Sequence, residues 1–243
     1  MWTSWSLDAL GDIGTNATPT AFDMDGTLYL IAGAGDGILR GWVKSGFGWQ
    51  SNESIVSGLN NSQQHSAVTA FSIGGTWYLI SLGSEGVVSG WEWNGSAWVA
   101  SSAIISGLNY MVNYVSVTAF EMGGTFYLIA ATGTGSDRGY EWNGSAWVDI
   151  TYSGSIASGL SSAYPFRSVF EMEGTWYLLA GSSSGFFDGW EWDGSWWQPC
   201  ASIVNGLPNI AGYSFPTVYY NGGWWLLAGD STGICRSWVL TEQ

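Results

Sequence analysis

The stretch Thr69–Trp98, TAFSIGGTWYLISLGSEGVVSGWEWNGSAW, decides the fold, because versions of it occur five times in the chain. The aromatic residue of its first apolar segment recurs at nearly constant spacing, with gaps of 49, 49, 50 and 49 residues. These aromatics are Phe22, Phe71, Phe120, Phe170 and Tyr219. A period of about 40 to 50 residues with several short strands per unit is typical of a propeller with one four-stranded blade per repeat.

The apolar segments inside the repeat have the character of strands. Trp77–Ser81 is short, unbroken and aromatic-rich, which is typical of a strand buried on both faces and too short for a helix. The pairs Gly74–Gly75 and Asn94–Gly95 predict two-residue hairpin turns on either side of the central strands. The segment Trp91–Trp93 alternates aromatic and acidic residues, as a strand with two different faces does. We therefore predict an all-β chain.

The two ends of the chain are expected to complete one another. The last repeat ends with Val239–Gln243 after its third strand, so it lacks a fourth. The segment Trp2–Asp8 can supply that strand, which would remove an exposed sheet edge. We predict one domain over residues 1–243: a five-bladed β-propeller of four-stranded antiparallel blades, with about 49 residues per repeat, closed by the N-terminal strand in the last blade.

The composition excludes some partners. Nineteen acidic residues against five Lys plus Arg give a formal charge of −14, and nucleic-acid binding needs a basic surface instead. No segment approaches the roughly 20 apolar residues of a membrane span, so membrane insertion is not expected. One histidine and two cysteines are too few for a structural zinc site, and we predict no cofactor and no metal.

The two cysteines admit two interpretations. Cys235 lies in the third strand of the last repeat, where it would serve as a small buried hydrophobic residue. A disulfide bridge between Cys200 and Cys235, which lie in adjacent blades, is the alternative.

The two faces of the predicted propeller differ. The first-to-second and third-to-fourth turns share one face, called here the short-turn face. The second-to-third turns and the links between repeats share the opposite, long-loop face, and recognition usually resides in such loops on a rigid scaffold. The links carry aromatic and amide side chains, which suit the apolar faces and hydroxyls of sugars, although ordinary polar loops are the alternative. The candidate ligand-binding residues in the links are His65, Asn109, Tyr110, Asn113, Tyr114, Tyr164, Arg167, Asn209 and Tyr213.

Acidic residues in the second-to-third turns extend the candidate site. Asp36, Glu85, Asp137 and Asp230 are taken as equivalent in the repeat. Four such carboxylates could accept sugar hydroxyls or hold a cation. Solvated turn residues are the alternative, because turns favour Asp in any case.

The sequence offers little for catalysis. The single histidine, His65, is the only basis for a Ser-His-Asp arrangement, and we assign no catalytic residue. A carboxylate pair stays open as an alternative, because some five-bladed propellers are glycoside hydrolases. The third-strand tryptophans, at 42, 91, 93, 142, 190, 192 and 238, are expected to fill the space between blades rather than to bind a ligand.

The segment Phe22–Gly33 with the following Asp36–Gly37 resembles the FG-GAP or integrin-α-like repeat. The calcium loop of that family is degenerate here, since only Asp23 and Asp25 match it, and the resemblance therefore implies no bound calcium. In blade number and near-identical blades the chain is also similar to tachylectin-2-type lectins, which bind amino sugars. The loop motifs of those lectins are not matched.

We predict a non-enzymatic ligand-binding propeller, lectin-like and glycan-recognising, that uses the long-loop face. We expect a monomeric domain, alone or within a larger chain, of an extracellular or cell-surface protein. The alternatives are a protein–protein adhesion or scaffold module, a glycoside hydrolase, and an engineered repeat protein without an evolved ligand.

Overall fold

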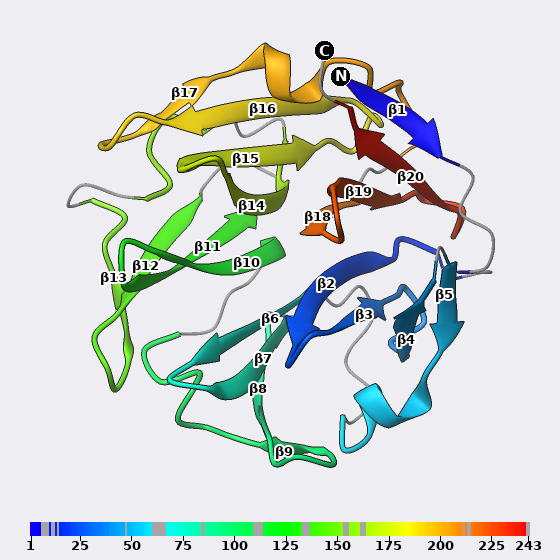
Figure 1. Ribbon diagram of the computed structural model, residues 1–243. Helices are drawn as coiled ribbons and strands as arrows, with labels where there is room; N and C mark the ends of the chain where they lie inside the picture. Colours follow the sequence, from blue (N-terminus) through cyan, green and yellow to red (C-terminus); the bar gives the residue numbers. More distant parts are fainter. Residues whose placement is uncertain are drawn as a thin grey trace.

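The fold is a closed ring of five antiparallel sheets with four strands each (Figure 1). The structure, a computed structural model, describes residues 1–5, 10, 13, 15–46, 48–59, 67–83, 86–108, 114–132, 137–152, 156–160, 164–210, 212 and 215–241, with only the backbone of Trp5, Tyr114, Val115 and Thr132. The innermost strands contact one another in ring order, and the last contacts the first. The predicted five-bladed propeller is confirmed.

From the axis outward, the strands of blades 1 to 4 follow chain order, and β1 takes the outermost place in blade 5. Blade 1 contains β2 (Thr18–Met24), β3 (Thr27–Gly33), β4 (Leu39–Ser45) and β5 (Gly48–Ser51). Blade 2 contains β6 (Ala67–Ile73), β7 (Thr76–Leu82), β8 (Val88–Trp93) and β9 (Trp98–Ala100). Blade 3 contains β10 (Tyr114–Met122), β11 (Thr125–Thr132), β12 (Arg138–Trp142) and β13 (Trp147–Asp149). Blade 4 contains β14 (Phe166–Met172), β15 (Thr175–Gly181), β16 (Phe187–Trp192) and β17 (Trp197–Pro199). Blade 5 contains β18 (Phe215–Tyr220), β19 (Trp224–Gly229), β20 (Cys235–Leu240) and β1 (Trp2–Trp5).

The N-terminal strand completes the last blade, as predicted. Strand β1 pairs antiparallel with β20, and Trp2 lies opposite Leu240. The N-terminal amino group donates to the Thr241 carbonyl at 2.9 Å, and the Thr241 N–H donates to the Met1 carbonyl at 3.0 Å. The two ends of the chain therefore lie side by side at the rim of the ring (Figure 1).

Two short 3-10 helices, η1 (Glu53–Val56) and η2 (Ala201–Val204), follow the fourth strands of blades 1 and 4. Each lies against a glycine of the third strand of its own blade. A Cβ atom on Gly41 would lie 2.4 Å from Ile55 Cγ2, and one on Gly189 would lie 2.1 Å from Ile203 Cγ2. Only glycine allows the link to pack this closely, which explains its recurrence in the third strand.

The first-to-second turn of blade 5 differs from the prediction, because Tyr220 pairs with Trp224 and three residues lie between them. In blades 1 to 4 these turns are two-residue hairpins, as predicted, and both central residues have positive φ, for example Asp25 at 55° and Gly26 at 79°. This is the type I′ geometry, whose twist matches that of the flanking strands.

In blades 2, 3 and 4 the third-to-fourth turns differ from the prediction, because they are four residues long. Trp93 pairs with Trp98, so the whole segment between them forms the loop. The Asn94 side-chain oxygen accepts hydrogen bonds from the N–H groups of Ser96 at 3.0 Å and Ala97 at 2.9 Å. The asparagine therefore closes this turn with its side chain, whereas the prediction gave it the backbone role of a type I′ residue.

In blades 2 to 5 the fourth-strand tryptophan bonds the blade to the link that precedes it. Trp98 Nε1 donates to the Ile55 carbonyl at 2.7 Å, and Trp147 Nε1 donates to the Ile104 carbonyl at 2.8 Å. The equivalent tryptophans of blades 4 and 5 make the same bond. The third-strand tryptophans pack as predicted: Trp42, Trp91, Trp190 and Trp238 are buried, and Trp93, Trp142 and Trp192 stack on the fourth-strand tryptophan with ring centroids 5.3 Å apart.

The two cysteines are not bridged, so the disulfide alternative is wrong. Cys200 precedes η2 in blade 4, and its Sγ lies 3.2 Å from Ser202 Oγ. Cys235 begins β20 in blade 5, and burial raises the pKa of its thiol to about 12. Cys235 is partly buried and packs against the apolar cluster of blades 5 and 1, so its interpretation as a small hydrophobic residue fits, although it is not fully buried.

Candidate functional site

Part of the predicted ligand-binding set lies outside the described residues, namely Glu85, His65, Asn109, Tyr110, Asn113 and Tyr213. Tyr114 begins β10, and only its backbone is described. The remaining predicted residues are Asp36, Asp137, Asp230, Tyr164, Arg167 and Asn209, and they lie in quite different surroundings.

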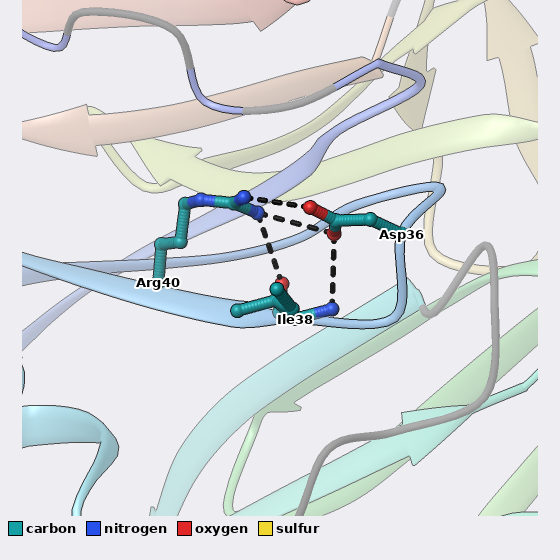
Figure 2. A network of polar contacts seen from close by, with 3 residues as sticks. All are labelled: Asp36, Ile38 and Arg40. Atoms are coloured by element: carbon teal, nitrogen blue, oxygen red, sulfur yellow. Dashed lines mark hydrogen bonds and ion pairs between the residues drawn. The ribbon is translucent and has the colours of Figure 1, made fainter.

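Asp36 lies in the turn between β3 and β4 and is bonded within that turn (Figure 2). Arg40 donates to both of its carboxylate oxygens, from Nη2 at 2.6 Å and from Nη1 at 3.2 Å. The Ile38 N–H adds a third bond at 3.0 Å. The hydrogen bonds from Arg40 hold the pKa of Asp36 below its ordinary value of 3.8, so this carboxylate stays ionised at neutral pH.

Asp230 lies in the turn between β19 and β20, and its carboxylate is fully buried. Its Oδ1 accepts hydrogen bonds from the Thr232 N–H at 2.8 Å, the Thr232 hydroxyl at 2.6 Å and the Ile234 N–H at 3.1 Å. Its Oδ2 lies 3.4 Å from Nη2 of Arg236, which is partly exposed. Asp230 thus organises its own turn and anchors an arginine at the surface.

Asp137 and Arg167 form an ion pair between blades 3 and 4. Arg167 Nη2 donates to Asp137 Oδ2 at 2.6 Å, and the exposed fractions of the two side chains are 0% and 9%. A buried guanidinium cannot contact a ligand unless the blades move apart. The structure therefore gives these two predicted binding residues a place in the packing between blades.

This buried pair occupies positions that are apolar in the other blades. Arg167 pairs in its ladder with Ala180, and the matching positions of the other innermost strands are Pro19, Val68, Val117 and Pro216. By the same alignment, Asp137 corresponds to Leu39, Val88, Phe187 and Cys235. At these two positions of the repeat, the ion pair of blades 3 and 4 is the exception to apolar residues.

Asp36, Asp137 and Asp230 do not occupy equivalent positions, which corrects the sequence interpretation for these three acids. Asp36 precedes the arginine of its third strand by four residues, Asp137 by one, and Asp230 by six. The arginines themselves are equivalent: Arg40, Arg138 and Arg236 lie opposite Ala32, Ala130 and Ala228. Sequence reasoning missed these three arginines. Their spacing of 98 residues, two repeats each time, was the available signal.

Apolar side chains also recur in the second-to-third turns of the long-loop face. One exposed residue directly follows the positive-φ glycine of the second-to-third turn in blades 1, 2, 4 and 5. These residues are Ile38, Val87, Phe186 and Ile234, with exposed fractions of 42%, 40%, 47% and 52%. The long-loop face therefore combines apolar side chains with arginine–carboxylate pairs.

The two remaining predicted residues lie in the links between blades. Tyr164 is half-buried just before β14, and its ring packs edge-on against Trp190 with centroids 6.1 Å apart. Asn209 is exposed in the link before β18. The next residue, Ile210, donates its N–H to the Gly185 carbonyl at 3.0 Å, which ties this link to the turn of blade 4.

Within the part of the chain that the structure describes, no three His, Cys, Asp or Glu side chains gather as metal ligands would. None of its described helices is long and apolar enough to span a membrane.

Comparisons with known proteins place the fold more firmly than the function. No family model matches the chain, and no curated protein matches it; the resemblance to FG-GAP repeats therefore stays a prediction. Among solved structures, CoXyl43, a GH43 β-xylosidase/α-arabinofuranosidase from a compost metagenome, has a TM-score of 0.71 at 12% identity, covering 100% of this chain and 96% of that one.

Lectins match as well. The SapL1 lectin in complex with α-methyl fucoside has a TM-score of 0.58 at 13% identity, covering 93% of this chain and 76% of that one. A variant of Aleuria aurantia lectin in complex with Fucα1-6GlcNAc has a TM-score of 0.52 at 13% identity, with coverages of 93% and 79%. At these identities the similarity is one of fold, and this chain shares its propeller architecture with both lectins and glycoside hydrolases.

Proposed function

We propose that this chain is a non-catalytic carbohydrate-binding propeller that uses its long-loop face. The similar structures include glycan-binding lectins and enzymes that cleave glycosides, so carbohydrate is the ligand class they have in common. Fold alone does not assign a function, and the choice between binding and hydrolysis depends on the state of the carboxylates.

The observation that carries the proposal is that arginine already holds the described carboxylates of the second-to-third turns. Glycoside hydrolysis needs two carboxyl groups flanking the scissile bond, one of them a proton donor with a raised pKa. Asp36, Asp137 and Asp230 instead each bond a guanidinium, in three different blades. The pKa of Asp36 is lowered, which is the wrong direction for an acid catalyst. The exposed carboxylate of Asp36 can accept hydrogen bonds from sugar hydroxyls, whereas Asp137 and Asp230 are buried, and none of these ion-paired acids is suited to cleaving a glycoside.

A glycoside hydrolase is the second candidate, and one observation favours it. The TM-score with the GH43 enzyme is 0.71, against 0.58 and 0.52 with the two lectins. An enzyme of this kind would need its carboxylates among side chains other than the ion-paired acids above.

Two measurements on the same preparation separate the candidates. The protein is applied to an array of neutral glycans, and it is incubated with nitrophenyl xylosides and arabinofuranosides. The proposal expects glycan binding without release of nitrophenol. Release that persists through purification and disappears on substitution of a carboxylate would establish the hydrolase instead, and neither binding nor release would reject both candidates.

A further inference from the structure

Three arginines occupy one position of the repeat. Arg40, Arg138 and Arg236 each begin the outer half of a blade, at or next to the start of the third strand, on the long-loop face. Each lies opposite an alanine of the second strand in the same ladder register. Blades 2 and 4 carry Ser89 and Asp188 at this position. The arginines therefore mark blades 1, 3 and 5.

This recurrence stands out because cations are scarce. The chain contains only five Lys plus Arg among 243 residues, and three of them lie at this one position. The other two have packing roles. Arg167 is buried in its ion pair with Asp137, and the Lys44 ammonium lies over the rings of Trp49 and Trp225, 5.2 and 5.5 Å from their centroids.

Each of the three arginines holds a carboxylate, but the acids come from different positions. The pairs are Arg40–Asp36 at 2.6 Å, Arg138–Asp149 at 3.2 Å and Arg236–Asp230 at 3.4 Å. The arginine side chains remain 29%, 46% and 42% exposed. Ion pairs of such exposure contribute little to stability. Stability is therefore a weak reason for the same exposed guanidinium to recur three times with three different partners.

Two of the arginines also have an apolar neighbour. Ile38 and Ile234 lie two residues before Arg40 and Arg236, and both are exposed on the same rim. Figure 2 shows Ile38 in the turn that Asp36 and Arg40 enclose. A guanidinium offers a planar fork of N–H donors, and the exposed carboxylates of Asp36 and Asp149 offer acceptors beside Arg40 and Arg138. A ring with adjacent hydroxyls and an apolar C–H face matches this combination.

We propose that the exposed guanidinium groups of Arg40, Arg138 and Arg236 form three subsites for a neutral monosaccharide with adjacent hydroxyls. The carboxylates of Asp36 and Asp149, 43% and 38% exposed, add acceptors at the first two subsites, whereas the buried Asp230 only positions Arg236. This proposal rests on the carbohydrate-binding function and specifies where the sugar binds. Anionic sugars are disfavoured, because each guanidinium already faces a carboxylate and the chain carries a formal charge of −14. Electrostatic repulsion would have to be overcome at every subsite.

The test uses the full chain and the neutral methyl glycoside that binds best on the array, with titration calorimetry giving stoichiometry and affinity. The variants are Arg40→Ala, Arg138→Ala, Arg236→Ala and their combination, with a triple Arg→Lys variant that keeps the charge but loses the fork. Ser89→Ala and Asp188→Asn, at the same position of blades 2 and 4, are the matched controls. Circular dichroism and the melting temperature verify that each variant folds.

The proposal expects about three sites per chain, loss of about one site per single substitution, and no binding by either triple variant at concentrations that saturate the wild type. The two controls should bind as the wild type does. Wild-type binding that survives in the folded triple Arg→Ala variant would overturn the subsites while leaving the carbohydrate function standing. A wild-type protein that binds no glycoside would overturn both.

Discussion

The Arg167–Asp137 ion pair allows a prediction about stability, because other blades carry apolar residues at the same two positions. It is the one ion pair among the described residues in which both side chains are buried. Asp137 Oδ1 is buried without a hydrogen-bond partner, so the desolvation of this carboxylate is incompletely compensated. Arg167→Val would leave Asp137 without its cation, and Asp137→Val would leave a guanidinium with an exposed fraction of 0%. Each single change should destabilise the protein by about 3–5 kcal/mol.

The double substitution should reverse this loss. Asp137 corresponds to Val88 and Arg167 to Val117, and those two valines belong to one apolar cluster between blades 2 and 3. Asp137→Val with Arg167→Val therefore copies a contact that the ring already contains. Replacing a buried ion pair by apolar residues of matching shape is neutral or stabilising by about 1–4 kcal/mol. The double variant should unfold at the same denaturant concentration as the wild type or higher.

Guanidinium unfolding, followed by tryptophan fluorescence and near-UV circular dichroism, measures these differences. Arg138→Ala is the control, because it breaks an ion pair whose side chains are 46% and 38% exposed and should cost at most about 1 kcal/mol. A double variant that loses as much stability as the two single variants together would refute the reasoning. So would a single variant that is no less stable than the control.

Three further predictions concern individual residues. Gly58→Ala should destabilise the protein by about 2–4 kcal/mol in denaturant titration, because φ is +82° and the added carbon would lie 2.1 Å from the Trp98 carbonyl oxygen of blade 2. Gly95→Ala is the control, since this glycine has positive φ but open space around it, and it should cost about half as much. Equal costs for the two variants would contradict the clash. Tyr219→Phe should change stability by less than about 1 kcal/mol, since the other four repeats carry Phe at this position. A larger loss by the same titration would disprove this. The carboxyl of Asp36 should titrate below pH 3.8 in carbon NMR. The contribution of its ion pair to folding stability is therefore present above pH 3.8 and is lost as the pH falls below that value. Arg40→Ala should move the titration midpoint upward, and an unchanged midpoint would show that the arginine does not lower this pKa.

The architecture was predictable because a constant period leaves few solutions. Spacing from Phe22 to Tyr219 and the incomplete last repeat together required five blades and a strand from the N-terminus, and both were found. The third-to-fourth turns were not read correctly, because Asn94–Gly95 has the composition of a two-residue hairpin. What closes that turn is a side-chain hydrogen bond, which residue type alone does not reveal.

The candidate site was less accessible to sequence reasoning. Turns favour Asp for local reasons, so the acids drew attention, although Asp36, Asp137 and Asp230 proved to lie at three different positions. The arginines they bond were overlooked, although the interval of two repeats could have marked them. The burial of Arg167 was beyond the sequence, because its partner comes from a neighbouring blade and only the ladder register shows that both positions are apolar elsewhere.

A crystal structure of the protein soaked with the neutral methyl glycoside selected on the array tests the central claim most directly. The account predicts sugar density on the long-loop face beside Arg40, Arg138 and Arg236, with its hydroxyls on the guanidinium and, in blades 1 and 3, also on the paired carboxylate. A single sugar bound near the ring axis, among the ends of the innermost strands and away from all three arginines, would contradict it.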